Sequence, residues 1–60
     1  MKILKYKGML INLYYFISAS EMESGQTSIS FVNGDYETLD IDFYTFQQFV
    51  TTNEVYLEIY

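Results

Sequence analysis

The dipeptide Asn33-Gly34 lies between two short runs, residues 27–32 and 36–41, in which apolar and polar side chains alternate. Alternation with a period of two is typical of a β-strand that has one buried face. Asn-Gly between two such runs is a strong hairpin signal, because both residues tolerate the positive φ angles of tight turns. The centre of the chain is therefore predicted to be a β-hairpin.

The apolar pattern also predicts the register of this hairpin. Ile29 and Phe31 share one face of the first strand, and Leu39 and Ile41 share one face of the second. A two-residue turn would put the two pairs on opposite faces of the sheet, since a one-residue slip turns every side chain over. We therefore predict a three-residue loop with a bulge, in which Gly34 is left-handed.

A short helix is predicted to follow the hairpin. Asp42 is a favourable N-cap, and Asn53 is expected to take the C-cap conformation. Residues 54–60 then alternate cleanly and predict a terminal strand. The helix is predicted from apolar residues at helical spacing, namely Phe43, Phe46, Phe49 and Val50.

Before the hairpin, residues 9–17 are predicted to form a strand and residues 18–26 a polar loop, while residues 1–7 can add a short strand that turns at Gly8. The fold class is therefore α+β. We expect a single domain over residues 1–60, built as a small antiparallel sheet of 3–5 strands with one short helix, in the order strand, strand, strand, helix, strand.

The N-terminal region also resembles a targeting segment. Lysines precede the apolar run 9–17, and Ser18-Ala19-Ser20 follows it, as at a secretory cleavage site. Cleavage would leave a cysteine-free remainder too short to fold readily by itself. The nine-residue run is also far shorter than the roughly 20 residues that span a bilayer. We therefore expect a retained strand and no membrane contact, with a targeting segment as the alternative.

Catalytic side chains are scarce in this chain. Its 60 residues include no cysteine and no histidine, which removes Ser-His and Cys-His nucleophile systems and the usual zinc ligands. Asp40 and Asp42 are a possible carboxylate pair, but Asp42 is already explained as a helix cap. The three glycines are isolated, so no phosphate-binding loop is present. We expect no enzyme activity, no cofactor and no metal site.

Charge is segregated along the sequence. The three lysines all lie in the first seven residues, and the net charge is −5. The rest of the chain carries only negative charge, which repels nucleic acid and attracts basic protein surfaces. We therefore expect a protein partner with a basic surface and no direct nucleic-acid binding, although the charge could serve solubility alone. The eight acids are Glu21, Glu23, Asp35, Glu37, Asp40, Asp42, Glu54 and Glu58.

Alternation also predicts which aromatic side chains are displayed. Tyr36, Tyr56 and Tyr60, together with Asp40 and Glu58, are expected to point away from the face that the helix covers. Tyrosines beside carboxylates suit partner recognition, because each ring combines contact area with a polar tip. The alternative is that tyrosine is simply a good strand former that tolerates partial exposure.

The predicted strand 9–17 is apolar on both faces. A single sheet of 60 residues with one helix has too few side chains to cover both faces of such a strand. We therefore expect a homodimer that forms through the sheet. The apolar side chains are Tyr14 and Phe16 on one face, and Leu13, Tyr15 and Ile17 on the other.

The segment Thr38–Tyr60 resembles a pattern of small phage-encoded proteins, with a strand ending in L-x-[IL], a capped aromatic helix, and T-x-x-E before a final strand. It is most similar to the short dimeric uracil-DNA glycosylase inhibitor of Bacillus phages, and residues 1–26 have no counterpart in that resemblance. The resemblance implies an acidic dimer that mimics DNA and holds an enzyme loop in a hydrophobic pocket. Leu39, Ile41, Phe46 and Glu54 match in kind.

Together these observations lead to a functional hypothesis. We expect a binding protein, encoded by a phage or mobile element, that inhibits a nucleic-acid-handling host protein in the host cytoplasm by DNA mimicry. The alternative is a structural or assembly subunit whose tyrosine-rich sheet face is a homo-oligomer interface; a secreted or membrane-attached peptide is a third reading. The predicted partner-binding residues are the acids Glu37, Asp40, Asp42, Glu54 and Glu58, with Tyr36, Tyr56 and Tyr60 as anchors.

Overall fold

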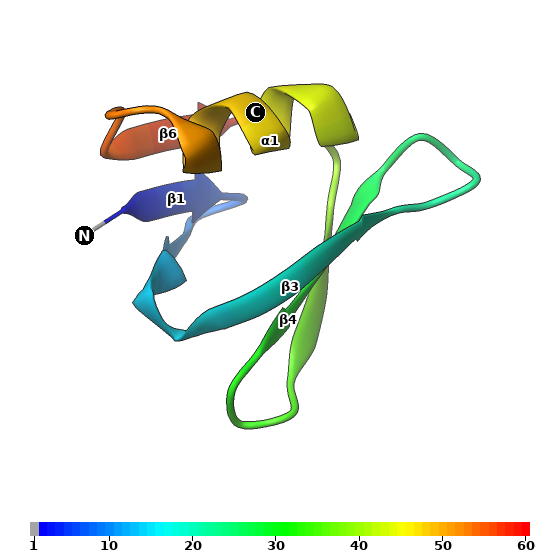
Figure 1. Ribbon diagram of the computed structural model, residues 1–60, viewed down its shortest axis with the longest axis horizontal. Helices are drawn as coiled ribbons and strands as arrows, with labels where there is room; N and C mark the ends of the chain where they lie inside the picture. Colours follow the sequence, from blue (N-terminus) through cyan, green and yellow to red (C-terminus); the bar gives the residue numbers. More distant parts are fainter. Residues whose placement is uncertain (1) are drawn as a thin grey trace.

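A computed structural model describes residues 2–60 of the chain (Figure 1). Within these residues the strands form two three-stranded sheets, and one α-helix packs beside them. The predicted α+β class, with small sheets and one short helix, is confirmed, whereas the element order differs. In chain order the elements are β1 (Ile3–Tyr6), β2 (Met9–Asn12), a 3-10 turn (Leu13–Tyr15), β3 (Phe16–Glu21), β4 (Thr27–Phe31), β5 (Tyr36–Leu39), α1 (Phe43–Thr51) and β6 (Tyr56–Ile59).

Sheet A has the strand order β2-β1-β6 and joins the two ends of the chain. The hairpin β1–β2 turns at Lys7 and Gly8, which have φ angles of 48° and 79°. β6 pairs with β1 in parallel, with Leu4 beside Leu57 and Tyr6 beside Ile59. Parallel strands require a long crossover connection, and here β2, all of sheet B and α1 lie between them. The expected purely antiparallel sheet is therefore wrong for this strand pair.

Sheet B has the order β3-β4-β5 and contains the predicted central hairpin. The backbone N–H of Phe31 donates to the carbonyl of Asp35 at 2.9 Å, and that of Gly34 donates to the carbonyl of Phe31 at 3.0 Å. Gly34 has a φ of 92°. The predicted three-residue loop with a left-handed Gly34 is thus confirmed. Its register places Ile29 and Leu39 on the same face, where both are fully buried.

The single strand predicted over residues 9–17 is wrong, because the chain turns at Leu13–Tyr15. The side-chain oxygen of Asn12 accepts a hydrogen bond from the backbone N–H of Tyr14 at 2.9 Å. This local bond competes with the strand ladder and ends β2. The chain then enters β3, which continues to Glu21, so the predicted loop over residues 18–26 is shortened to residues 22–26.

The helix begins where the sequence predicts. The carboxylate of Asp42 accepts hydrogen bonds from the backbone N–H of Thr45 at 2.9 Å and from its hydroxyl at 2.7 Å. The predicted C-cap at Asn53 is wrong: Thr52 is the cap, with extended backbone angles. The Nζ of Lys2 donates to the carbonyl of Thr52 at 2.8 Å, so a cation from the N-terminal segment satisfies this helix end.

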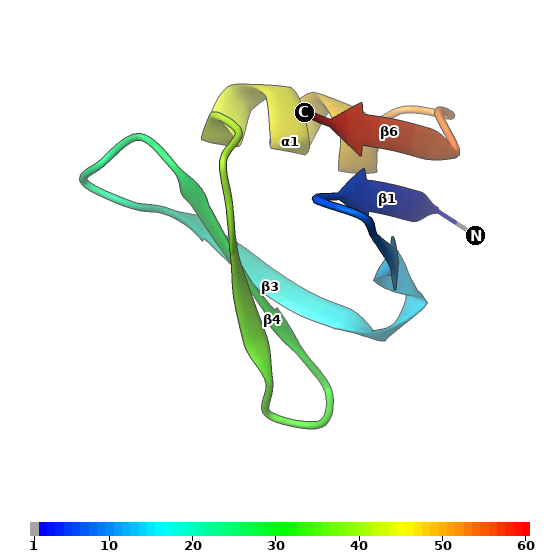
Figure 2. The same cartoon turned by 180° about the vertical axis from the view of Figure 1, so that it is seen from behind.

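One core lies between α1 and the inner faces of the two sheets (Figure 2). Phe46 of α1 meets Phe16 of β3 edge to face, with ring centroids 5.7 Å apart. The one buried polar residue among residues 2–60 is Thr27, whose hydroxyl donates to the carbonyl of Ile41 at 2.9 Å. The buried apolar residues are Leu4, Tyr6, Leu13, Ile29, Leu39, Phe46, Phe49 and Ile59.

Candidate partner-binding surfaces

The predicted tyrosines lie on two different sheets. Tyr56 and Glu58 share the outer face of sheet A, because Leu57 and Ile59 between and after them face the core. Tyr36 belongs to β5 in sheet B. The expectation of one common outer face is therefore wrong, since it assumed that all strands belong to a single sheet. Tyr60, which follows β6, is 95% exposed.

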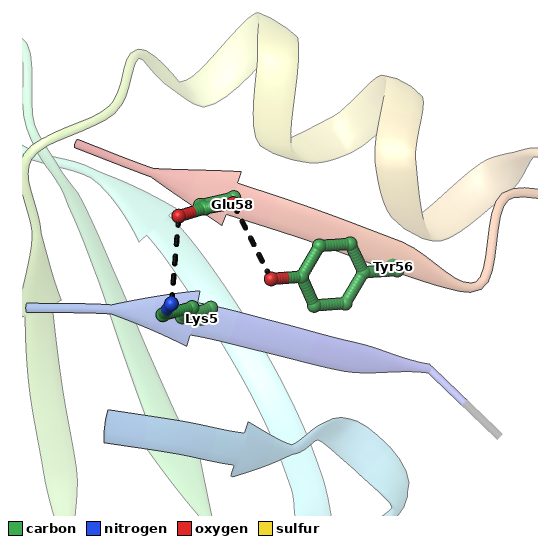
Figure 3. Close-up of polar contacts among 3 residues, drawn as sticks. All are labelled: Lys5, Tyr56 and Glu58. Atoms are coloured by element: carbon green, nitrogen blue, oxygen red, sulfur yellow. Dashed lines mark hydrogen bonds and ion pairs between the residues drawn. The ribbon is translucent and has the colours of Figure 1, made fainter. Parts of the chain in front are cut away.

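The outer face of sheet A carries a small polar group (Figure 3). The parallel register puts Lys5 beside Glu58, and their Nζ and Oε2 atoms are 3.6 Å apart. The hydroxyl of Tyr56 donates to the other carboxylate oxygen of Glu58 at 3.4 Å. Glu58 is thus compensated by a cation and by a hydroxyl donor, which makes it a poor substitute for a phosphate.

The outer face of sheet B is rich in hydroxyl groups, and Tyr36 lies among them. Tyr36 pairs with Ser30, and the hydroxyl oxygens of Ser18 and Ser30 are 2.7 Å apart. Glu37 is the next residue along β5 and therefore faces the opposite side of the sheet from Tyr36. This face was not predicted, because residues 18–21 were assigned to a loop. Its members are Ser18, Ser20, Ser28, Ser30, Tyr36 and Thr38.

Four acids occupy the end of sheet B that leads into α1. The sheet register places Glu21 beside Thr27 and Thr27 beside Leu39, which Asp40 follows directly. Adjacent strands lie about 5 Å apart, so Glu21 and Leu39 are separated by about 10 Å. The β3–β4 loop and the segment leading into α1 lie on the same side of Figure 1. We call this group the acidic end; it consists of Glu21, Glu23, Asp40 and Asp42.

The acidic end is exposed and has no cation beside it. All of its members are exposed, and none of them forms an ion pair within residues 2–60. The side-chain hydrogen bond from Thr45, reinforced by its backbone N–H, lowers the pKa of Asp42 from its ordinary value. Asp40 and Asp42 were predicted from the sequence, whereas Glu21 and Glu23 were not, because Glu21 reaches this end of the sheet only through the cross-strand register.

The remaining predicted acids lie elsewhere. Glu54 is in the link between α1 and β6. Asp42 lies at the start of α1, which is about 13 Å long, so the length of the helix separates these two acids. Its backbone carbonyl accepts a hydrogen bond from the ammonium group of Lys2, and its carboxylate accepts one from the hydroxyl of Thr52 at 3.4 Å. Glu54 is therefore close to a positive charge and separate from the acidic end.

An apolar hollow of about 480 Å³ lies between β2 and the β4–β5 turn. Two of its residues are largely exposed, Leu10 at 70% and Val32 at 63% of the residue's accessible surface. The hollow exists because the turn after Asn12 separates β2 from β3, which sequence reasoning did not foresee. Its lining residues are Leu10, Ile11, Asn12, Tyr15, Phe31, Val32 and Asn33.

Within residues 2–60, the acidic side chains do not come together in a group that could hold a metal ion. Over the same residues, no helix combines the length and apolar character needed to cross a membrane. In comparisons with known proteins, no family model, no curated protein and no solved structure matches this chain.

Proposed function

We propose that this protein is a small acidic binding protein that inhibits a nucleic-acid-handling protein by occupying its nucleic-acid site. The observation that supports this proposal is the acidic end, where four exposed acids occupy the same end of sheet B and form no ion pair within residues 2–60. A basic groove attracts such a group as it attracts phosphates, and this attraction speeds association most strongly at low salt.

The arrangement of the acids favours mimicry over metal binding. The acidic end spans two separate segments, the end of β3 with the loop that follows it and the link into α1. Carboxylates that converged on one point would suit a cation, whereas spaced carboxylates suit a row of basic side chains. Asp42 stays ionised to lower pH than an ordinary carboxyl because Thr45 lowers its pKa.

In this proposal the chain has no catalytic centre and needs no cofactor. It acts in the cytoplasm of a host cell, and its gene belongs to a phage or mobile element. Tyr36, Tyr56 and Tyr60 remain candidate anchors, although they do not share one sheet. Glu58 contributes little in this proposal, because Lys5 and Tyr56 already occupy its carboxylate.

The test is displacement of host proteins from immobilised DNA. Host lysate is bound to DNA-cellulose, and the purified chain is added at 50 mM and at 200 mM salt. We expect the wild type to release a specific DNA-binding protein, with release weakening by about tenfold or more at the higher salt. The triple variant Glu21→Gln, Glu23→Gln, Asp40→Asn should lose this activity. Asp42 is left intact because it caps the helix.

The matched control removes the same number of charges elsewhere. The variant Asp35→Asn, Glu54→Gln, Glu58→Gln has the same net charge as the first variant but keeps the acidic end. It should retain most of the displacement activity. Equal loss in both variants would show that only net charge matters, and release that is insensitive to salt would contradict mimicry.

The second candidate function is a structural or assembly subunit. The observation that favours it is the exposed apolar surface around the hollow, since large apolar patches on soluble proteins mark interaction sites. An assembly subunit would form an obligate oligomer and release nothing from DNA-cellulose, so the same experiment separates the two functions.

A further inference from the structure

The outer edge of β2 is free in the described chain. β2 is the first strand of sheet A and pairs only with β1, in an antiparallel register that places Leu4 beside Ile11. An edge strand offers a row of unpaired backbone donors and acceptors to another strand. Proteins commonly protect such edges with lysine, proline, a bulge or a covering segment.

The hydrogen bonds show which backbone groups face outward. The N–H of Leu13 donates to the carbonyl of Lys2 at 3.0 Å, so position 13 bonds toward β1. Positions in an antiparallel pair alternate between bonding toward the partner strand and away from it. Met9 and Ile11 therefore also bond toward β1, and the backbone groups of Leu10 and Asn12 point to the free side.

The chemistry of this edge suits an uncharged strand. β2 consists of Met9, Leu10, Ile11 and Asn12, with neither charge nor proline among them. The hollow beside it leaves room between the strand and the β4–β5 turn and is mainly apolar. A strand that added here would bring its own apolar side chains against Leu10 and Val32.

The chain itself carries a strand of this kind. We propose that two copies pair their β2 strands antiparallel, about a two-fold axis that passes beside Ile11, and form one continuous six-stranded sheet from the two three-stranded sheets A. In this register Leu10 of each copy exchanges backbone hydrogen bonds with Asn12 of the other. Ile11 then faces Ile11 of the second copy in a close, non-hydrogen-bonded pair.

The distribution of charge supports a second copy as the occupant. Two chains of net charge −5 repel each other, so they must meet where acids are sparse. The acidic end lies at the far side of sheet B, and the β2 edge itself is neutral.

A single introduced cysteine tests the register directly, since the native chain has none. The facing Cα atoms of a non-hydrogen-bonded pair are about 4.5 Å apart, which is within the range that a disulfide bridges. Ile11→Cys should give a covalent dimer under mild oxidation. The control variant Val55→Cys also introduces one cysteine, but at a position distant from the β2 edge. It should stay a monomer on a non-reducing gel.

Sedimentation tests the interface without a cross-link. The wild type should sediment at twice the mass of the 7.1 kDa chain, and Leu10→Lys at the mass of one chain. The matched control is Val55→Lys, which adds the same charge at a side chain that is 63% exposed and should leave the dimer intact. Circular dichroism of both variants checks that they remain folded.

A wild-type monomer at every concentration would overturn the proposal. So would a dimer that survives Leu10→Lys, or an Ile11→Cys chain that cross-links no better than Val55→Cys.

Discussion

At the residue scale, the carboxylate of Asp42 serves both the fold and the proposed surface. It accepts two hydrogen bonds from Thr45 and so satisfies a free N–H at the start of α1. It is also a member of the acidic end. The same negative charge therefore begins the helix and contributes to the field that a basic partner would meet.

We predict that Asp42→Ala lowers the urea midpoint of unfolding, because the cap is lost. Asp42→Asn is the matched control, since asparagine is an equally good cap without charge. Chemical denaturation at pH 7 with circular dichroism detection measures both variants. A midpoint for Asp42→Ala equal to the wild type would mean that the cap contributes nothing.

The pH dependence of stability follows from the lowered pKa of Asp42. A carboxyl whose pKa is lower in the folded state stabilises the fold at pH values above its ordinary pKa of 3.8, and this contribution is lost as pH falls through the folded value. Asp42→Asn cannot titrate at this position. The wild type should therefore lose stability relative to Asp42→Asn as the pH is lowered below about 4.

Individual residues also show which structural roles could be predicted from the sequence. Asp42 and Gly34 behave as predicted because their roles depend on neighbours two or three residues away. Asn53 does not, because the end of α1 is stabilised by Lys2, a residue about fifty positions earlier. A local signal for the C-cap could not compete with a tertiary contact that the sequence does not display.

At the element scale, the β4–β5 hairpin is the most locally determined part of the fold. Its three-residue loop requires a positive φ at Gly34, and the apolar residues on both strands agree with the register that this loop imposes. The turn and the side-chain pattern thus favour the same structure.

We predict that Gly34→Ala destabilises the protein by about 1 kcal/mol, because alanine is strained at a φ of 92°. No atom lies within 4 Å of a Cβ at this position, so the cost comes from the backbone alone. Gly34→Asn should recover much of the loss, since asparagine tolerates left-handed angles. Thermal unfolding measures the difference, and equal stability of all three chains would contradict the strain.

The N-terminal elements show the opposite case. Residues 9–17 have the composition of one strand, but the side chain of Asn12 bonds to Tyr14 and turns the chain. A single hydrogen bond of this kind contributes about 1 kcal/mol, comparable to strand propensity. Packing of Leu13 and Phe16 into the core then favours the turn over the continuous strand.

At the scale of the whole molecule, the charge distribution opposes folding. The acidic end concentrates like charges that the described lysines do not compensate, and the net charge is −5. Like charges held close together destabilise a compact state, and salt screens them over about 10 Å at 0.1 M. A surface kept for binding a basic partner would have this cost.

We therefore predict that the melting temperature rises between 20 mM and 200 mM sodium chloride. The rise should shrink in the variant Glu21→Gln, Glu23→Gln, Asp40→Asn, because the screened repulsion is already removed. In the control variant Asp35→Asn, Glu54→Gln, Glu58→Gln a larger part of the rise should remain, although its net charge is the same. Differential scanning calorimetry measures all three, and a melting temperature independent of salt would contradict the repulsion.

The amino-acid sequence by itself determined the elements whose signals are local: the central hairpin and its loop, the start of α1, and the alternating final strand. It also determined the segregation of charge. Only the tertiary structure decided that the strands divide into two sheets, that β6 pairs in parallel with β1, and that Glu21 ends its strand level with Thr27 and Leu39. The physical reason is that backbone pairing between distant strands is independent of side-chain identity, so many partners satisfy the same hydrogen bonds, and the shared apolar core selects among them.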